Sequence, residues 1–432
     1  MAKVFVDITP LRRYPAFRRL WAGNAVSQIG SQLSVVAVAL EVYNLTHSDL
    51  DVGLISLVQL VPALFGSVVG GAIADAMDRR KLLVFTSSVM ALFAMGMALE
   101  VGRHHPSVLV LYALAGGAAM FQGVNGPAST AVMISIVERD VMVQANALRQ
   151  LSNQISSVLG PALAGIMIAA FGGTRIVFWA NAGSFLFAIA AVLSVGARPP
   201  QGGATRFGWK SITEGFAFLR GRQVMQGTFI ADLNATILGM PTALFPAMAS
   251  THFHGGPRTV GLLYAAPGIG AAIGASLSGW TSRIRRPGYA VCVAVACWGV
   301  ALAIFGLAPW TIVAIACLAI AGGADMISAI FRSTIIQVEA PDRLRGRLTS
   351  IQMAVVQSGP RLGNTEAGLV AAATSTQFSV VSGGIGCVIG IALVAKLMPR
   401  FVGYELPPAG VVIGGEAGAP EAPEEAPPVP AG

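Results

Sequence analysis

Charged residues are scarce in this chain. Asp, Glu, Lys and Arg make up 11% of its 432 residues, while hydrophobic residues make up 54%. Soluble domains carry about 25% charged residues. The composition therefore excludes an ordinary soluble domain and predicts a protein that crosses a membrane many times.

Cysteine and lysine are also scarce, and each shortage excludes a class of site. The four cysteines lie inside apolar stretches, without the His, Asp or Glu neighbours that a metal site needs. We interpret them as small core residues and expect no metal and no cofactor. None of the four lysines follows a glycine, so the Gly-Lys-Ser/Thr loop that holds ATP phosphates is missing. This argues against an ATP-driven pump, and we expect no enzymatic activity. The cysteines are Cys292, Cys297, Cys317 and Cys387.

The excess of basic residues indicates membrane topology rather than nucleic-acid binding. The net charge is +8, but Lys and Arg occur in short clusters between apolar spans and not on one soluble face. Cytoplasmic loops of membrane proteins are rich in these two residues. Only Arg103, Arg175 and Arg258 fall in loops that this rule places outside, so both termini are predicted to be cytoplasmic.

Twelve apolar spans can be drawn, which predicts an all-α membrane protein with twelve transmembrane helices. A helix rises about 1.5 Å per residue and must cross a hydrocarbon core of about 30 Å. Between the sixth and seventh spans, Trp209, Ile212, Phe216 and Leu219 recur at helical spacing, which predicts an amphipathic helix on the membrane surface. The predicted spans are 19–43, 52–75, 82–101, 107–136, 145–171, 174–195, 226–249, 259–280, 288–307, 310–336, 347–372 and 377–397.

The two halves of the chain repeat one another. An even number of spans in each half gives repeats of parallel orientation. The predicted organisation is a six-helix bundle over 1–196, a cytoplasmic linker with the amphipathic helix over 197–225, a second six-helix bundle over 226–400 and a disordered tail over 401–432. The patterns that recur 201 to 208 residues apart are Val52-Gly53-Leu54 with Val260-Gly261-Leu262, Asp75 with Gly279, Val137-Glu138 with Val338-Glu339, and Gly160 and Gly165 with Gly363 and Gly368.

A charged stretch, Gly70 to Lys81, follows the second span. Asp75 falls in the last turn of the predicted helix, where the helix dipole disfavours a carboxylate, so it needs a positive partner. One interpretation is a stop-transfer anchor with solvated charges. The other is a hinge that joins two helical bundles, in which Asp75 meets the start of span eleven near Arg345 or Arg347. On the second interpretation the gating residues are Gly71, Asp75, Asp78, Arg79 and Arg80.

This stretch resembles the loop signature of the major facilitator superfamily, in which a glycine, three residues and an acid precede a basic cluster. It differs from the signature by Ala76, where an arginine is common, and by Asp78, where a glycine is common. The resemblance extends to the siderophore, drug and macrolide efflux subfamily and covers nearly the whole chain except the tail. The further segments that carry it are Pro15-Ala16-Phe17-Arg18, Leu45-Thr46-His47-Ser48, Gly215-Phe216-Ala217-Phe218-Leu219, Gly261-Leu262-Leu263-Tyr264-Ala265-Ala266 and Gly270-Ala271-Ala272-Ile273-Gly274-Ala275.

The resemblance implies a monomeric exporter in the bacterial cytoplasmic membrane. Its partners would be a small amphiphilic substrate, membrane lipid and the protons that drive transport. Gly160-Pro161 followed by Gly165 is similar to the glycine-proline signature of proton-coupled antiporters, with one extra residue before the last glycine. A kinked packing helix explains the same residues. The alternatives are an uptake carrier of the same fold and a membrane receptor or scaffold that transports nothing.

The resemblance also implies that spans one, four, seven and ten line a central cavity. Polar residues in these spans share helix faces, at about 100° per residue. Unpaired polar groups that face lipid are costly, so these faces should meet a cavity or another helix. For the uncharged residues, hydrogen bonding between helices is an equal alternative. The candidate wall residues are Asn24, Gln28, Gln32, Gln122, Asn125 and Thr236.

Five charged residues inside the spans are candidates for the proton and substrate pathway. A charge in mid-membrane costs at least about 2.5–3.5 kcal/mol and usually serves transport. Asp325 and Arg332 lie two turns apart, about 10 Å along an ideal helix, so we expect Arg332 to find another partner such as Glu366. A permanent structural pair of Asp325 with Arg361 is the alternative. Glu41 lies near the outer end of span one and is a weaker candidate. The five are Asp232, Asp325, Arg332, Arg361 and Glu366.

Overall fold

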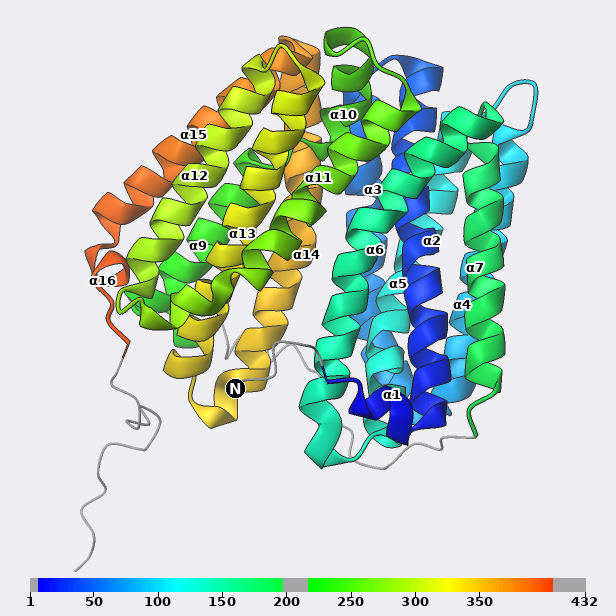
Figure 1. Cartoon of the computed structure of the whole chain (residues 1–432), viewed down its shortest axis with the longest axis horizontal. Helices are drawn as coiled ribbons and strands as arrows, with labels where there is room; N and C mark the ends of the chain where they lie inside the picture. The colour runs from blue at the N-terminus through cyan, green and yellow to red at the C-terminus, as the bar shows by residue number, and fades with distance from the viewer. Residues whose placement is uncertain (1–6, 197–216, 407–432) are drawn as a thin grey trace, which may run out of the picture.

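The computed structural model describes residues 7–196 and 217–406, and this part of the chain contains helices and no strands (Figure 1). A short helix at the start is followed by six long ones, which form the first half of the molecule. They are α1 (Thr9–Arg13), α2 (Pro15–Thr46), α3 (Asp49–Ala76), α4 (Arg79–Val101), α5 (Val108–Ile136), α6 (Met142–Phe171) and α7 (Arg175–Leu193), with the 3-10 turn η1 (Arg139–Val141) before α6.

The second half repeats this plan with one interrupted span. The interrupted span comprises α9 (Gln223–Leu238), the 3-10 turn η2 (Thr242–Leu244), α10 (Phe245–Ala247) and the π-turn η3 (Met248–His252). After it come α11 (Pro257–Ser276), the 3-10 turn η4 (Ser278–Arg283), α12 (Pro287–Leu307), α13 (Thr311–Glu339), α14 (Asp342–Ala373), α15 (Thr376–Leu397) and α16 (Pro399–Val402).

The helices match the predicted spans, and the all-helical membrane fold is confirmed. Eleven segments in the described part are long and apolar enough to cross a membrane, and they correspond to spans one to ten and twelve. α14, at span eleven, is 32 residues long but too polar to be among them, so the count of twelve stays a prediction. The amphipathic helix predicted within 197–225 lies mostly outside the described residues, as does the tail beyond 406.

Proline residues inside the long helices do not end them. Pro62, Pro127, Pro161, Pro267 and Pro360 all lie within continuous helices. Neighbouring helices and local adjustments satisfy the freed carbonyls in membrane bundles, which is why proline is tolerated there. Side-chain caps begin three of the described helices. A serine hydroxyl accepts a backbone N–H at the start of α3 and of α15, and the Asp78 carboxylate does so at the start of α4.

The interruption of span seven was not predicted. α9 ends at Leu238, and Gly239 and Pro241 follow before the chain turns again. Gly239 and Pro241 favour a break here, because glycine is a poor helix former and proline lacks an N–H. Neither residue type is sufficient alone, since Gly160-Pro161 lies within the continuous helix α6. Two side chains satisfy the exposed backbone: Trp298 Nε1 donates to the Gly239 carbonyl at 3.0 Å, and Asn364 Oδ1 accepts from the Ala243 N–H at 2.9 Å.

The two halves meet at one end of the molecule and separate at the other (Figure 1). We call the end with α1 and α16 the terminal end and the end with His47 and His254 the distal end. Contacts between the halves join α3 to α14 and α6 to α11. On the distal side, Asp49 Oδ2 accepts from Thr376 Oγ1. The structure is therefore closed at the distal end.

Glycine pairs carry these contacts. A Cβ added at Gly165 would lie 3.0 Å from Gly261 Cα, and one added at Gly53 would lie 3.3 Å from Gly368 Cα. The sequence repeat relates Gly53 to Gly261 and Gly165 to Gly368. The two contacts are thus equivalent under the repeat, and each allows two helix backbones to approach as small residues do in membrane bundles.

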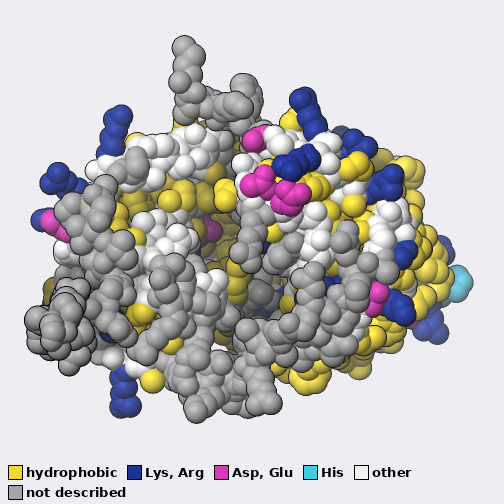
Figure 2. All heavy atoms as spheres, turned by 90° about the horizontal axis from the view of Figure 1, so that it is seen from below, with side chains coloured by type: hydrophobic (Ala, Val, Ile, Leu, Met, Phe, Trp, Pro, Cys, Tyr) yellow, Lys and Arg dark blue, Asp and Glu magenta, His cyan; other side chains and the backbone are white. Residues whose placement is uncertain are grey.

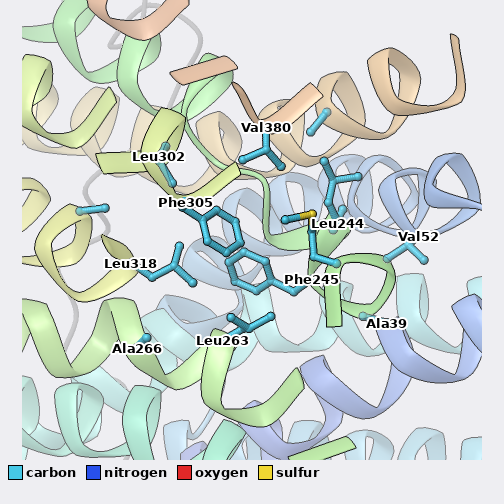
Figure 3. Packing of buried hydrophobic residues seen from close by; sticks show 14 of the residues in the cluster. Ala39, Val52, Leu244, Phe245, Leu263, Ala266, Leu302, Phe305, Leu318 and Val380 are labelled. Atoms are coloured by element: carbon cyan, nitrogen blue, oxygen red, sulfur yellow. The ribbon is translucent and has the colours of Figure 1, made fainter. Parts of the chain in front are cut away.

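Seen from the terminal end, the molecule is hollowed between its halves, and Lys and Arg side chains stand mainly at its outer edge (Figure 2). The distal side is filled by apolar packing (Figure 3). There Phe245 from α10 packs edge-on against Phe305 from α12, with ring centroids 5.9 Å apart, and Leu263 lies beside them. The interrupted span thus anchors the closed distal end.

Candidate functional site

Three charged side chains join α9 to α13 inside the second half. Arg332 Nη2 lies 2.9 Å from Oδ1 of Asp232 and 3.6 Å from Oδ1 of Asp325. Its Nη1 donates to the Ser328 hydroxyl at 3.0 Å. The Asp232 and Arg332 side chains are each 5% exposed, whereas that of Asp325 is 44% exposed. With both acids ionised, the cluster carries two negative charges and one positive charge, and Asp325 is its most exposed member.

The expectation that Arg332 has a partner other than Asp325 is confirmed, but two details of it were wrong. Asp325 and Arg332 are not too far apart to interact, because the long arginine side chain covers most of the two-turn separation. Arg332 pairs with Asp232 on α9 rather than with Glu366, which forms no ion pair among the described residues. The alternative pair of Asp325 with Arg361 is absent from the described structure as well.

A cavity of about 360 Å³ lies between the two halves, toward the closed end. The first half contributes side chains from α2, α3, α4, α5 and α7, and the second half from η2, α11 and α14. Arg361 is the one charged residue among the described residues that line it. Its Nη1 is buried without a hydrogen-bond partner. The polar residues of the wall are Ser31, Ser34, Ser56, Gln59, Gln122, Asn181, Thr242, Tyr264, Gln357, Arg361 and Asn364.

A second recess, of about 190 Å³, lies within the first half. Four of the predicted wall residues, Asn24, Gln28, Gln122 and Asn125, line it. Three of these four also hydrogen-bond to neighbouring helices: Asn24 donates to Ser129, Gln28 to Asn153, and Asn125 to Thr86 and Ser87. Both interpretations, cavity wall and contact between helices, apply to the same side chains.

Two predicted wall residues lie at helix contacts and line neither space. A Cβ added at Gly160 would meet the Cβ of Gln32 at 2.3 Å, so Gln32 packs beneath α6. Thr236 is 7% exposed, and its hydroxyl donates to the Asp232 carbonyl and packs on Gly359 of α14. Their helical angle placed them on a polar face, but the close approach of a glycine-bearing helix covers that face.

The glycine-proline segment of α6 performs two packing roles. At Gly160, α6 packs closely against Gln32 of α2. At Gly165, it packs closely against Gly261 of α11. Pro161 lies between them, and its carbonyl would be 2.6 Å from a Cβ added at Gly261. The segment therefore sits against both halves of the molecule.

The described part of the charged stretch holds the first half together. Asp78 caps α4 by accepting the Arg80 N–H at 2.9 Å, and Arg79 donates to the Ala131 carbonyl of α5 at 3.5 Å. The Arg80 guanidinium donates to the Leu193 carbonyl at the end of α7. A Cβ added at Gly71 would meet nothing within 4 Å. The side chains of Asp75, Arg345 and Arg347 lie outside the described residues, so the hinge between the halves stays a prediction.

Comparison with known proteins identifies the family. The family model MFS_3, described as transmembrane secretion effector, matches residues 6–405. The chain belongs to this family. Enterobactin exporters are similar over nearly the whole length. That of Citrobacter koseri is 29% identical over 404 residues, or 93% of this chain and 96% of its own, and that of Shigella boydii serotype 18 is 29% identical over 395 residues, or 91% and 94%.

Solved structures show the same fold. A bacterial homologue of the human lysosomal transporter Spinster, in an inward-facing and unoccupied conformation, aligns with a TM-score of 0.72 at 16% identity and covers 93% of this chain and all of its own. The nucleoside transporter NupG aligns with a TM-score of 0.71 at 12% identity, over 89% of this chain and 98% of its own. The predicted major facilitator fold is thereby confirmed, and the chain is a secondary transporter of small molecules.

Proposed function

We propose that this transporter exports a small amphiphilic molecule from the cytoplasm of a bacterium across its inner membrane, in exchange for protons. Export follows from its similarity to proteins named as enterobactin exporters. The positive-inside pattern supports cytoplasmic termini, so that the hollow at the terminal end faces the cytoplasm and the distal end faces outward.

The cluster of Asp232, Arg332 and Asp325 is the observation that carries proton coupling. One guanidinium between two carboxylates leaves one uncompensated negative charge, and a charge in the membrane interior is costly. One proton on the accessible Asp325 makes the cluster neutral while Asp232 keeps its ion pair. A proton that moves through 100 mV supplies about 2.3 kcal/mol, which is enough to drive concentrative export.

The test uses everted membrane vesicles, in which an exporter loads the lumen, with enterobactin as the first substrate because the curated relatives are named for it. Asp325→Asn is expected to retain exchange of substrate down its gradient and to lose accumulation driven by an imposed proton gradient. Asp232→Asn tests the partner acid, and Glu366→Gln is the matched control, since Glu366 forms no ion pair among the described residues.

Three results bear on the proposal. Loss of driven accumulation in Asp325→Asn or Asp232→Asn, with exchange retained, supports it. A full response to the proton gradient in both variants would refute the assignment of the proton carrier to this cluster. Loss of driven accumulation in Glu366→Gln alone would assign the proton carrier to Glu366 on α14. Accumulation in right-side-out vesicles instead of everted ones would indicate an uptake carrier.

A further inference from the structure

Arg361 is an unpaired cation in a cavity without acids. No Asp or Glu is found among the described residues of the wall, and Arg361 forms no ion pair there. Its Nη1 is buried and has no acceptor. A buried guanidinium N–H group without an acceptor is unfavourable, because it has lost its hydrogen bonds to water and gained none in the protein. A membrane protein that keeps such a group has a use for it.

Residues on the same face of α14 complete a site for an anion. Gln357, Arg361 and Asn364 follow one another at spacings of four and three, so they form one stripe of the helix, and all three line the cavity. The side-chain oxygen Oδ1 of Asn364 is held in place, because it accepts hydrogen bonds from the Thr242 hydroxyl at 2.7 Å and from the Ala243 N–H at 2.9 Å. The amide Nδ2 of Asn364 therefore remains as a second donor beside the guanidinium.

The rest of the wall suits an apolar or aromatic body. Val38, Val52, Ile55, Met97 and Phe185 line the cavity beside the polar groups. A volume of about 360 Å³ is within the range of small-molecule sites, which are mostly apolar with a few convergent polar groups. Arginine pairs best with planar oxyanions such as carboxylates, because its fork donates two parallel hydrogen bonds.

We propose that Arg361, with Asn364 beside it, binds the anionic group of the transported molecule, so that the substrate class is amphiphiles that carry a carboxylate or a comparable planar oxyanion. This proposal rests on the proposed export function, because it assigns the substrate class of the same cavity. The site is distinct from the cluster of Asp232, Arg332 and Asp325, whose arginine is already paired with acids.

Equilibrium binding to the purified full-length protein tests the site without transport. The probes are 2-naphthoate and its neutral analogue 2-naphthamide, measured by calorimetry in detergent. The native protein is expected to bind the anion about 10- to 100-fold more tightly than the amide. Arg361→Gln should abolish this preference and leave binding of the amide unchanged, and Arg361→Lys should retain part of it because the charge remains.

Arg149→Gln is the matched control. Arg149 is an exposed arginine of the recess in the first half, where it donates to Thr130, so its removal should leave the preference intact. Equal affinity for both probes in the native protein, or loss of the preference in Arg149→Gln but not in Arg361→Gln, would overturn the proposal. If Arg361→Gln weakens the binding of both probes equally and lowers the melting temperature, Arg361 has a structural role, and this result would also overturn the proposal.

The outcome is independent of proton coupling. If the protein prefers the anion through Arg361 but shows no proton-driven transport, the proposed anion site is supported and proton coupling is refuted. Proton-driven export of a neutral molecule, without any anion preference, would keep the function and refute the site.

Discussion

The contact of Gly165 with Gly261 gives a prediction about the conformational balance. An added Cβ at Gly165 would lie 2.7 Å from the Pro257 carbonyl oxygen and 3.0 Å from Gly261 Cα. Carbon atoms pack best about 3.5–4.0 Å apart, and the atoms met here belong to the backbone and cannot rotate away. Gly165→Ala must therefore push α6 and α11 apart at the closed end.

The size of the effect follows from the cost of overpacking, which is typically about 1–3 kcal/mol. That cost applies to the closed distal end and is relieved when the halves separate there. A change of this size shifts a two-state equilibrium by about 5- to 150-fold. Gly165→Ala should accordingly increase the population that is open at the distal end.

The assay measures distances between spin labels on His104→Cys in the first half and Thr251→Cys in the second, both exposed near the distal end. The background replaces the four native cysteines by alanine. Gly183→Ala is the control, because it makes the same change in helix α7 where an added Cβ meets nothing within 4 Å. A distance distribution that does not lengthen with Gly165→Ala, or that lengthens equally with Gly183→Ala, would refute the reasoning.

Three further predictions test the topology, the hinge and the interrupted span. A reporter fused after Arg400 should be cytoplasmic and one inserted near His254 external, and the reverse pattern would contradict the topology. Asp75→Asn should slow transport at normal abundance, because the loss of a partly exposed pair worth about 1 kcal/mol shifts the conformational balance about fivefold; an unchanged rate would exclude the hinge. Asn364→Ala should lower the unfolding free energy by about 1–3 kcal/mol, because the Ala243 N–H and the Thr242 hydroxyl lose their acceptor. Thermal unfolding in detergent measures this, with the exposed Gln357→Ala as control, and equal melting temperatures for the two variants would contradict it.

The sequence predicted the helices well because length and hydrophobicity decide them. Every predicted span has a helix at its place, and the basic cluster that starts at Arg79 lies in the first turn of α4. The interruption of span seven was missed because its residues are apolar, and hydrophobicity does not distinguish a helix from a turn inside a bundle. Gly239 and Pro241, two residues apart, were the signal that could have revealed it.

The side-chain partners could be predicted only in part. The interior charges were recognised as unusual, but the pairing of Arg332 with Asp232 depends on how α9 and α13 pack, which one sequence does not contain. The length of the Arg332 side chain was also neglected. The separation of Asp325 and Arg332 was taken between their positions along the helix and not between the ends of their side chains. Gln32 was assigned to the cavity from its helical angle, yet Gly160 brings α6 against it.

α14 connects the three features that these proposals invoke. It packs on α9 through Gly359 and Gly363, where an added Cβ would lie 2.2 Å from the Thr236 hydroxyl and 2.1 Å from the Thr236 carbonyl. Thr236 in turn donates to the carbonyl of Asp232 at 2.8 Å. Such close contact leaves no free space between the two helices. If a change of charge at the cluster of Asp232, Arg332 and Asp325 shifts α9, α14 must therefore move with it. The same helix carries Arg361 into the cavity and Gly368 into the closed contact with Gly53. One rigid helix, α14, can therefore respond to proton uptake, to substrate binding and to closure of the distal end. Such a shared element is what the exchange of protons for substrate physically requires.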